Sequence, residues 1–165
     1  MENPITVTFK LNGKTTALAV EPLTTLRSAL REQLHLHATK AGCGQGGCGS
    51  CTVLVDGEPM MSCLLPVEDI AGRHVTTLES ITPAEGLHPI QQAFIDSNAF
   101  QCGYCTPGMV MLSKALLDHD GAPGEAGIAQ ALSGNICRCT GYQPIIRAVG
   151  VAAEAMTGGE GAQGS

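Results

Sequence analysis

The eight cysteines are the residues whose type and spacing point most directly to chemistry. They fall into two groups of four, separated by a long stretch without cysteine, and no cysteine is left over. Four thiolates are a complete ligand set for a structural zinc ion or for a [2Fe–2S] cluster. The sequence therefore predicts two metal centres, with ligands Cys43, Cys48, Cys51 and Cys63 for the first and Cys102, Cys105, Cys137 and Cys139 for the second.

The spacing within each group separates the competing interpretations. Four residues separate Cys43 from Cys48 and two separate Cys48 from Cys51, which is the plant-type ferredoxin pattern completed by a distant cysteine. Structural zinc prefers two close cysteine pairs, and disulfides need an oxidising compartment. Cys137 and Cys139 are also awkwardly close for separate bridges. The pattern favours two [2Fe–2S] clusters, with zinc and disulfides as the alternatives.

Glycines surround the first three cysteines, at positions 42, 44, 46, 47 and 49. Glycine lets a loop adopt positive φ and bring its backbone close to a cluster, where N–H groups can donate to anionic sulfur. The segment Gly44–Gly49 also matches a G-x-G-x-x-G pattern. It contains a cysteine and no helix is expected to follow it, so a dinucleotide site is rejected.

Charge and hydropathy narrow the function classes. Nine Lys and Arg against fifteen Asp and Glu give a net charge of −6, which argues against nucleic-acid binding. No apolar run is long enough to span a membrane, and no export signal is recognised, so we expect a cytoplasmic protein. Charged residues make up only 15% of the chain, which fits either a large protein interface or a glycine-rich, loop-rich chain.

The first half of the chain has the pattern of an α+β unit. Residues 5–11 alternate apolar and polar side chains, and Asn12-Gly13 predicts a hairpin to a second strand over 15–20. Leu23, Leu26, Leu30 and Leu34 indicate a helix capped by Thr24 or Thr25. A second hairpin is expected over 52–63 and a last strand over 74–78. We place this first domain at residues 1–80.

Helical patterns fill the second half, which we place at residues 81–157. Pro107, Pro123 and Pro144 each precede an apolar stripe, and Leu87, Ile90 and Phe94 indicate one helix more, giving four helices. The glycine-rich residues 158–165 are expected to be disordered. Three Phe, two Tyr and no Trp provide few large core residues, so metal centres would contribute to the stability of the fold.

The sequence around both cysteine groups resembles a known family. The stretch Gly42–Thr52 followed by Cys63 is similar to the first cluster motif of the molybdenum hydroxylases. The stretches Gln101–Met109 and Gly134–Tyr142 are similar to the second. Together they resemble the small iron–sulfur subunit of the xanthine dehydrogenase, aldehyde oxidase and carbon monoxide dehydrogenase family, over about residues 5–155. The resemblance implies an N-terminal β-grasp, plant-type ferredoxin-like domain and an all-α four-helix [2Fe–2S]-binding domain.

The resemblance also implies a function and partners. Electrons would pass from a molybdopterin centre in a large catalytic subunit to the second cluster, then to the first, and finally to FAD in a third subunit or to a cytochrome. Gln101 and Cys139 would contact the pterin, and this chain would hold no catalytic residue. Relatives commonly form a dimer of heterotrimers. The alternatives are a free-standing two-cluster ferredoxin carrier and a zinc-binding interaction module.

Some residues stay outside these proposals. The five histidines have no ligand spacing to the cysteines, so a Rieske-type centre is not expected. Arg138 would either offset part of the cluster charge or meet a partner carboxylate. Tyr104 would either shield the second cluster or face the partner subunit.

Overall fold

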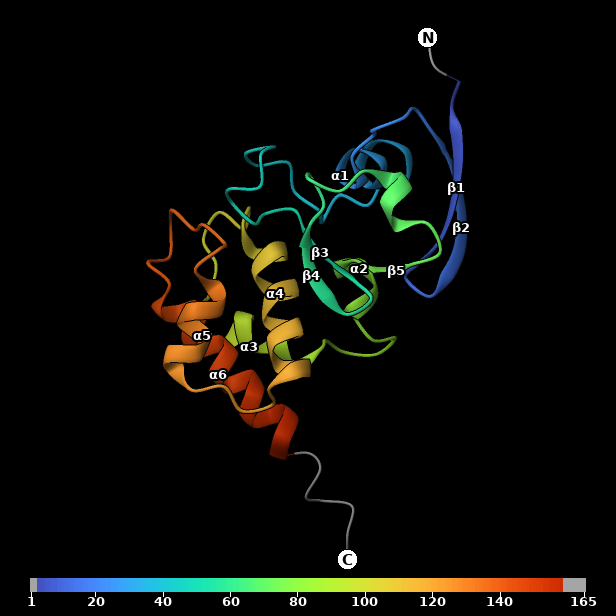
Figure 1. The fold of residues 1–165 in the computed structure, drawn as a ribbon. Helices are drawn as coiled ribbons and strands as arrows, with labels where there is room; N and C mark the ends of the chain where they lie inside the picture. Colours follow the sequence, from blue (N-terminus) through green and yellow to red (C-terminus); the bar gives the residue numbers. More distant parts are fainter. Residues whose placement is uncertain (1–2, 159–165) are drawn as a thin grey trace, which may run out of the picture.

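The computed structural model describes residues 3–158, which form a five-stranded mixed sheet followed by a group of helices (Figure 1). The strands lie in the order β2-β1-β5-β3-β4, and β1 and β5 are the parallel neighbours. The predicted α+β class is therefore confirmed. The strands are β1 (Ile5–Leu11), β2 (Lys14–Val20), β3 (Thr52–Val55), β4 (Glu58–Met61) and β5 (His74–Thr76).

Both predicted hairpins are confirmed. Asn12 and Gly13 have φ values of 51° and 81°, and Asp56 and Gly57 have 54° and 90°. Two successive positive φ values are typical of the two-residue turn that matches the right-handed twist of paired strands. The second hairpin fixes the register of β3 against β4.

The helix predicted after β2 starts later than its leucine pattern suggested. Thr25 caps α1 (Leu26–Ser28) through its side-chain oxygen, which accepts a hydrogen bond from the Ser28 backbone N–H. The helix continues directly as a π-helical turn over Ala29–Gln33. Leu23 is not part of the buried stripe, because it lies before the cap with φ of 62° and is 73% exposed. A 3₁₀ turn at Val67–Ile70 was not anticipated.

The helices of the second half begin close to prolines. Proline occupies the first turn of α3 and of α4, where its missing N–H removes no helical hydrogen bond. The helices are α2 (Leu78–Ile81), α3 (Pro89–Asp96), α4 (Thr106–His119), α5 (Glu125–Leu132) and α6 (Gln143–Gly158). Gly158, placed in the tail by the sequence pattern, ends α6, and residues 159–165 lie outside the described residues. None of the helices within residues 3–158 has the length and apolar character to cross a membrane.

Strand β3 contributes side chains to two hydrophobic cores, one on each of its faces. All four of its residues are buried. Because side chains alternate along a strand, Val53 and Val55 join the core of the sheet and α1, whereas Leu54 joins the core of the helices. Phe9 and Phe94 are the largest buried side chains of these two cores. The two halves are therefore packed on opposite faces of one strand.

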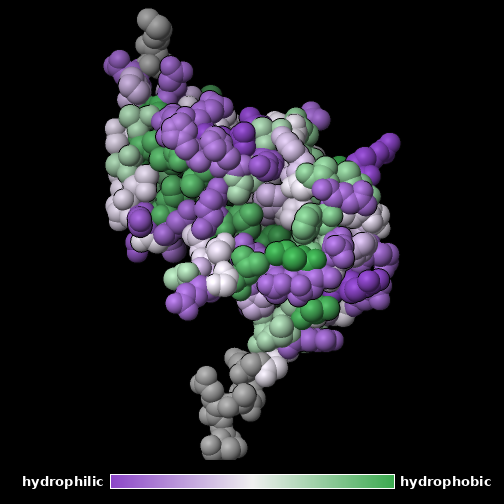
Figure 2. Space-filling model, turned by 180° about the vertical axis from the view of Figure 1, so that it is seen from behind, coloured by the Kyte–Doolittle hydropathy of each residue, from purple (hydrophilic) through white to green (hydrophobic). Residues whose placement is uncertain are grey.

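Apolar side chains also remain at the surface. Leu23, Leu64, Leu87, Ile95, Phe100, Tyr104, Ile136 and Val151 are all at least 40% exposed. Figure 2 shows green hydrophobic patches between the purple polar residues on one face of the molecule. Such patches are typical of surfaces that contact other proteins.

Phe94 and Ile95 on α3 allow a matched test of the helical core. We expect Phe94→Ala to destabilise the chain by about 3–5 kcal/mol, since Phe94 is 2% exposed and its loss leaves a cavity. Ile95 is 47% exposed, so Ile95→Ala should change stability by about 0.5 kcal/mol or less. Chemical unfolding followed by circular dichroism checks both, and equal effects of the two substitutions would contradict the described packing.

Candidate metal centres

The two cysteine groups lie at the same end of the molecule. The loop of residues 38–51, cyan in Figure 1, lies beside the loops that precede α4 and α6. One cavity of about 230 Å³ is lined by cysteines from both groups, together with Gly42, Ser50, Tyr104, Ile136 and Arg138. The cysteines that line it are Cys43, Cys48, Cys102, Cys105, Cys137 and Cys139.

The four thiols of the first group lie in two pairs. The side chains of Cys43 and Cys48 are hydrogen-bonding neighbours, and the Cys43 backbone N–H also donates to Cys48 Sγ at 3.4 Å. The Cys51 and Cys63 side chains are hydrogen-bonding neighbours. The β3–β4 hairpin produces this second pair, because Cys51 precedes β3, Cys63 follows β4, and Thr52 pairs with Met61 between them.

The second group is also arranged in pairs. Cys139 Sγ lies 3.6 Å from Cys102 Sγ, and the side chains of Cys105 and Cys137 are hydrogen-bonding neighbours. The loop that carries Cys137 is held by Tyr142, whose hydroxyl accepts from the Cys137 N–H at 2.9 Å and donates to the Asn135 carbonyl at 3.0 Å. The four thiols thus come from two loops fixed by α4 and α6.

This donor set fits a [2Fe–2S] cluster in each group. Such a cluster has two irons, and each iron takes two protein ligands. The thiols accordingly meet as Cys43 with Cys48, Cys51 with Cys63, Cys102 with Cys139, and Cys105 with Cys137. Within residues 3–158 no three His, Cys, Asp or Glu side chains are grouped as a single metal ion would require.

Backbone N–H groups favour the thiolate form at several of these sulfurs. The N–H groups of Gln45 and Gly47 point to Cys43 Sγ at 3.5 and 3.2 Å and lower the pKa of this exposed thiol to about 7. At Cys137, burial raises the pKa, but hydrogen bonds from the Thr140 hydroxyl and N–H outweigh it, so the pKa is lowered. Donors to anionic sulfur are what a cluster site requires.

Other thiols have raised pKa values, which favours their protonated form. Burial raises the pKa of Cys51, and it raises the pKa of Cys105 to about 12. The hydrogen bond with Cys102 raises the pKa of Cys139. Because only thiolates bind iron, metal binding at these positions must release protons.

The loops of the two groups touch at the level of the backbone, in a region we call the junction, formed by residues 48–50, 106–108 and 134–137. Ile136 N–H donates to the Cys48 carbonyl at 2.9 Å. A Cβ at Gly108 would lie 2.4 Å from the Gly49 carbonyl oxygen. Gly49 itself has φ of 69° and lies against Asn135. Glycine is therefore required at 49 and 108 by conformation and by close approach.

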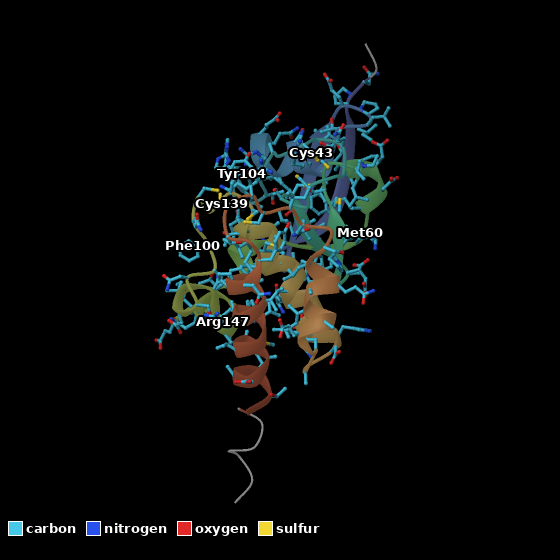
Figure 3. All side chains as sticks on the ribbon, turned by 90° about the vertical axis from the view of Figure 1, so that its left-hand side faces the viewer. Cys43, Met60, Phe100, Tyr104, Cys139 and Arg147 are labelled. Carbon is cyan, nitrogen blue, oxygen red and sulfur yellow. The ribbon has the colours of Figure 1, made fainter. Side chains whose placement is uncertain are left out.

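The residues predicted to contact the pterin are at the surface. Gln101 and Cys139 are both exposed, as is Cys102. Phe100 and Tyr104 beside them are 42% and 48% exposed, and the Tyr104 hydroxyl donates to the Ala41 carbonyl at 2.8 Å. Figure 3 shows Tyr104 and Cys139 close together, with Cys43 above and Phe100 below. The pterin contacts of Gln101 and Cys139 remain a prediction.

The sequence analysis predicted Cys48, Gly49 and Cys137 of the junction as parts of the metal centres, but it gave no role to Asn135 or Gly108. Asn135 is 3% exposed and Gly108 is buried in the first turn of α4. Both lie inside the quoted motifs, so their position among the cysteines was a usable signal. His88, given no role, accepts from the Ile90 N–H and caps α3 together with Gln91.

The chain matches two known families of iron–sulfur domain. Residues 9–76 match the model of the 2Fe-2S iron-sulfur cluster binding domain, and residues 77–150 match that of the [2Fe-2S] binding domain. The chain is thus an iron–sulfur protein with two [2Fe–2S] binding domains.

The relatives then identify the family. The chain is 46% identical to one subunit of the nicotinate dehydrogenase of Pseudomonas putida, covering 90% of this chain and 95% of the relative. It is 45% identical to subunit beta of the 6-hydroxypseudooxynicotine dehydrogenase complex of Paenarthrobacter nicotinovorans, covering 88% and 92%. A chain of quinoline 2-oxidoreductase from Pseudomonas putida 86 superposes with a TM-score of 0.91 at 41% identity, covering 96% and 99%.

This chain belongs to the iron–sulfur subunits of the molybdenum hydroxylase family. It is an oxidoreductase subunit whose function is electron transfer, and its relatives are small subunits of multi-subunit complexes. The family expected from the cysteine motifs is confirmed.

Gly108 and Gly150 provide a matched test of the junction. We expect Gly108→Ala to cost about 1–3 kcal/mol and to lower the iron content of the purified protein, because its methyl group would collide with the Gly49 carbonyl. A Cβ at Gly150 meets nothing within 4 Å, so Gly150→Ala in α6 should be neutral or stabilise by up to about 1 kcal/mol.

Iron analysis and thermal unfolding of both variants check this expectation. Full iron content and an unchanged unfolding midpoint in Gly108→Ala would show that the two loops are not in backbone contact.

Proposed function

We propose that this chain connects a molybdopterin-bearing catalytic subunit to an FAD-bearing subunit, and that it does so with two [2Fe–2S] clusters held by the two cysteine groups. When bound, such a cluster accepts and releases one electron at a time. The chain's own contribution is to hold the eight thiolates, donate N–H groups to them, and fix the two sites relative to each other. The large subunit would oxidise an aldehyde or an N-heterocycle.

The proposal includes the finer description of both domains. The N-terminal sheet with α1 packed on it is proposed to be a β-grasp, plant-type ferredoxin-like domain. The helices α3 to α6 are proposed to form a four-helix cluster-binding domain. In support, each half has its own hydrophobic core and its own set of four cysteines.

Electron transfer between the two centres is supported most directly by the hydrogen bond from the Ile136 N–H to the Cys48 carbonyl, which is 2.9 Å long. Cys48 is a proposed ligand of the first centre, and Ile136 is bonded to Cys137, a proposed ligand of the second. The two sites are therefore linked through one residue and one hydrogen bond. A protein that used the clusters only for stability would not need them so close.

Exposure supports a direction for the two partners. Gln101, Cys102 and Cys139 form an exposed edge beside Phe100 and Tyr104, which suits a partner that brings a pterin to the second centre. Cys43 is exposed on the loop of the first centre, where Leu64 is 58% exposed, which suits the FAD-bearing partner. A cytoplasmic dimer of heterotrimers completes the proposal, since thiols stay reduced in that compartment.

Metal analysis of the native complex tests the proposal. We expect about four irons and four acid-labile sulfides for each copy of this chain, two of each per cluster. The complex should also contain molybdenum and a flavin. Cys51→Ser and Cys137→Ser should each remove about half of the iron and a different reduced-state EPR signal.

Two results would contradict the proposal. One is a colourless chain that binds zinc. The other is a native protein that runs near the 17.0 kDa of the chain alone, without molybdenum, as a free electron carrier would.

A further inference from the structure

A guanidinium group lies against the loop of the first centre. A Cβ at Gly44, the residue after Cys43, would lie 3.5 Å from Arg27 Nη1. The backbone of Arg27 is fixed at the same place, because its N–H donates to the Ser62 carbonyl at 3.0 Å, and Ser62 precedes the proposed ligand Cys63. The fold therefore places the charge of Arg27 beside the first centre.

Two more cations lie on the segments next to this loop. Arg31 follows four residues after Arg27, and its Nη1 donates to the carbonyls of His37 and Thr39 at 3.3 and 2.9 Å. These two residues lead into the loop, and Lys40 comes directly after them. The side chains of all three cations are partly exposed. We call Arg27, Arg31 and Lys40 the basic rim.

The basic rim stands out in an acidic chain. Residues 22–55 contain these three cations and a single acidic residue, Glu32, whereas the whole chain has nine Lys and Arg against fifteen Asp and Glu. Within residues 3–158 the ion pairs use Arg73 and Lys114, so no carboxylate among these residues neutralises the rim. The rim is therefore free to pair with carboxylates of another protein.

An exposed apolar side chain lies against the same loop. A Cβ at Gly46 would lie 2.5 Å from Leu64 Cδ1, so Leu64 packs on the loop two residues after Gly44, and it is still 58% exposed. An apolar side chain with charged neighbours is typical of protein–protein interfaces, in which the apolar group is covered and the charges select the partner.

We propose that the basic rim and Leu64 form the docking site for an acidic surface of the FAD-bearing partner. The inference rests on the proposed function, which places that partner at the exposed Cys43, and it adds the charge of the partner's surface. A cluster on four thiolates would make the loop negative and would repel an acidic surface. The rim cations offset this repulsion and attract the partner's carboxylates, which brings the partner to the first centre.

The test is salt elution of the native complex, held on a resin through this chain, with flavin, molybdenum and iron measured at each salt concentration. Arg27→Glu reverses the charge that lies against the loop. We expect it to weaken the attachment of the flavin subunit about tenfold or more, so that flavin is lost at a salt concentration at which the wild-type complex retains it. Molybdenum and iron should be retained.

Two further variants make the test decisive. Arg27→Gln removes the charge and keeps a long polar side chain beside the loop, so it should release flavin at an intermediate salt concentration even if Arg27→Glu loses its iron. Lys14→Glu makes the same change of charge at the start of β2, on the far side of the molecule from the loop (Figure 1). It should release flavin at the same salt concentration as the wild type.

Flavin retention equal to the wild type in both Arg27 variants would overturn the inference. A shifted reduction potential of the first centre without earlier loss of flavin would also overturn it, because Arg27 would then act on the centre and not on the partner. A native wild-type complex without flavin, or without two EPR signals, would instead contradict the proposed function itself.

Discussion

The structure depends on one close backbone contact between segments far apart in the chain. Gly108 lies so close to the Gly49 carbonyl that it has no room for a side chain, and Asn135 occupies the space that a side chain at Gly49 would need. The Ile136 N–H bonds the Cys48 carbonyl at the same place. This contact fixes the distance between the two cysteine groups. Electron transfer requires a fixed short distance, because its rate falls steeply as the two centres move apart. A looser connection between the two halves would leave two separate metal sites.

The rest of the fold supports that contact. Strand β3 is buried on both faces, so its side chains belong to the core of the sheet on one face and to the core of the helices on the other. Helix α4 packs in the second core and begins at the junction. Few large side chains contribute to the cores, and only Phe9 and Phe94 among the aromatic residues are nearly fully buried within residues 3–158. Metal binding free energy is also folding free energy. The cores contain few large side chains, so cluster binding by the eight thiols would stabilise loops that hydrophobic burial does not.

Local signals in the sequence predicted much of this structure. Asn12-Gly13 and Asp56-Gly57 specify their turns through positive φ, and prolines mark the starts of helices, because both effects act within a few residues. The cysteine spacing indicated the family for the same reason. Leu23 was misassigned because a leucine at helical spacing does not reveal that its backbone lies before the N-cap. The contact of Asn135 with Gly49 joins residues of opposite halves, and no local pattern encodes it.

The central claim is that the two centres form one electron-transfer unit across the junction. The most direct measurement is low-temperature EPR of the native complex at potentials that reduce one centre or both. The account predicts that the signals split by spin–spin interaction when both centres are reduced, and that the splitting disappears when only one is reduced. A fully reduced spectrum equal to the sum of two independent signals would contradict it.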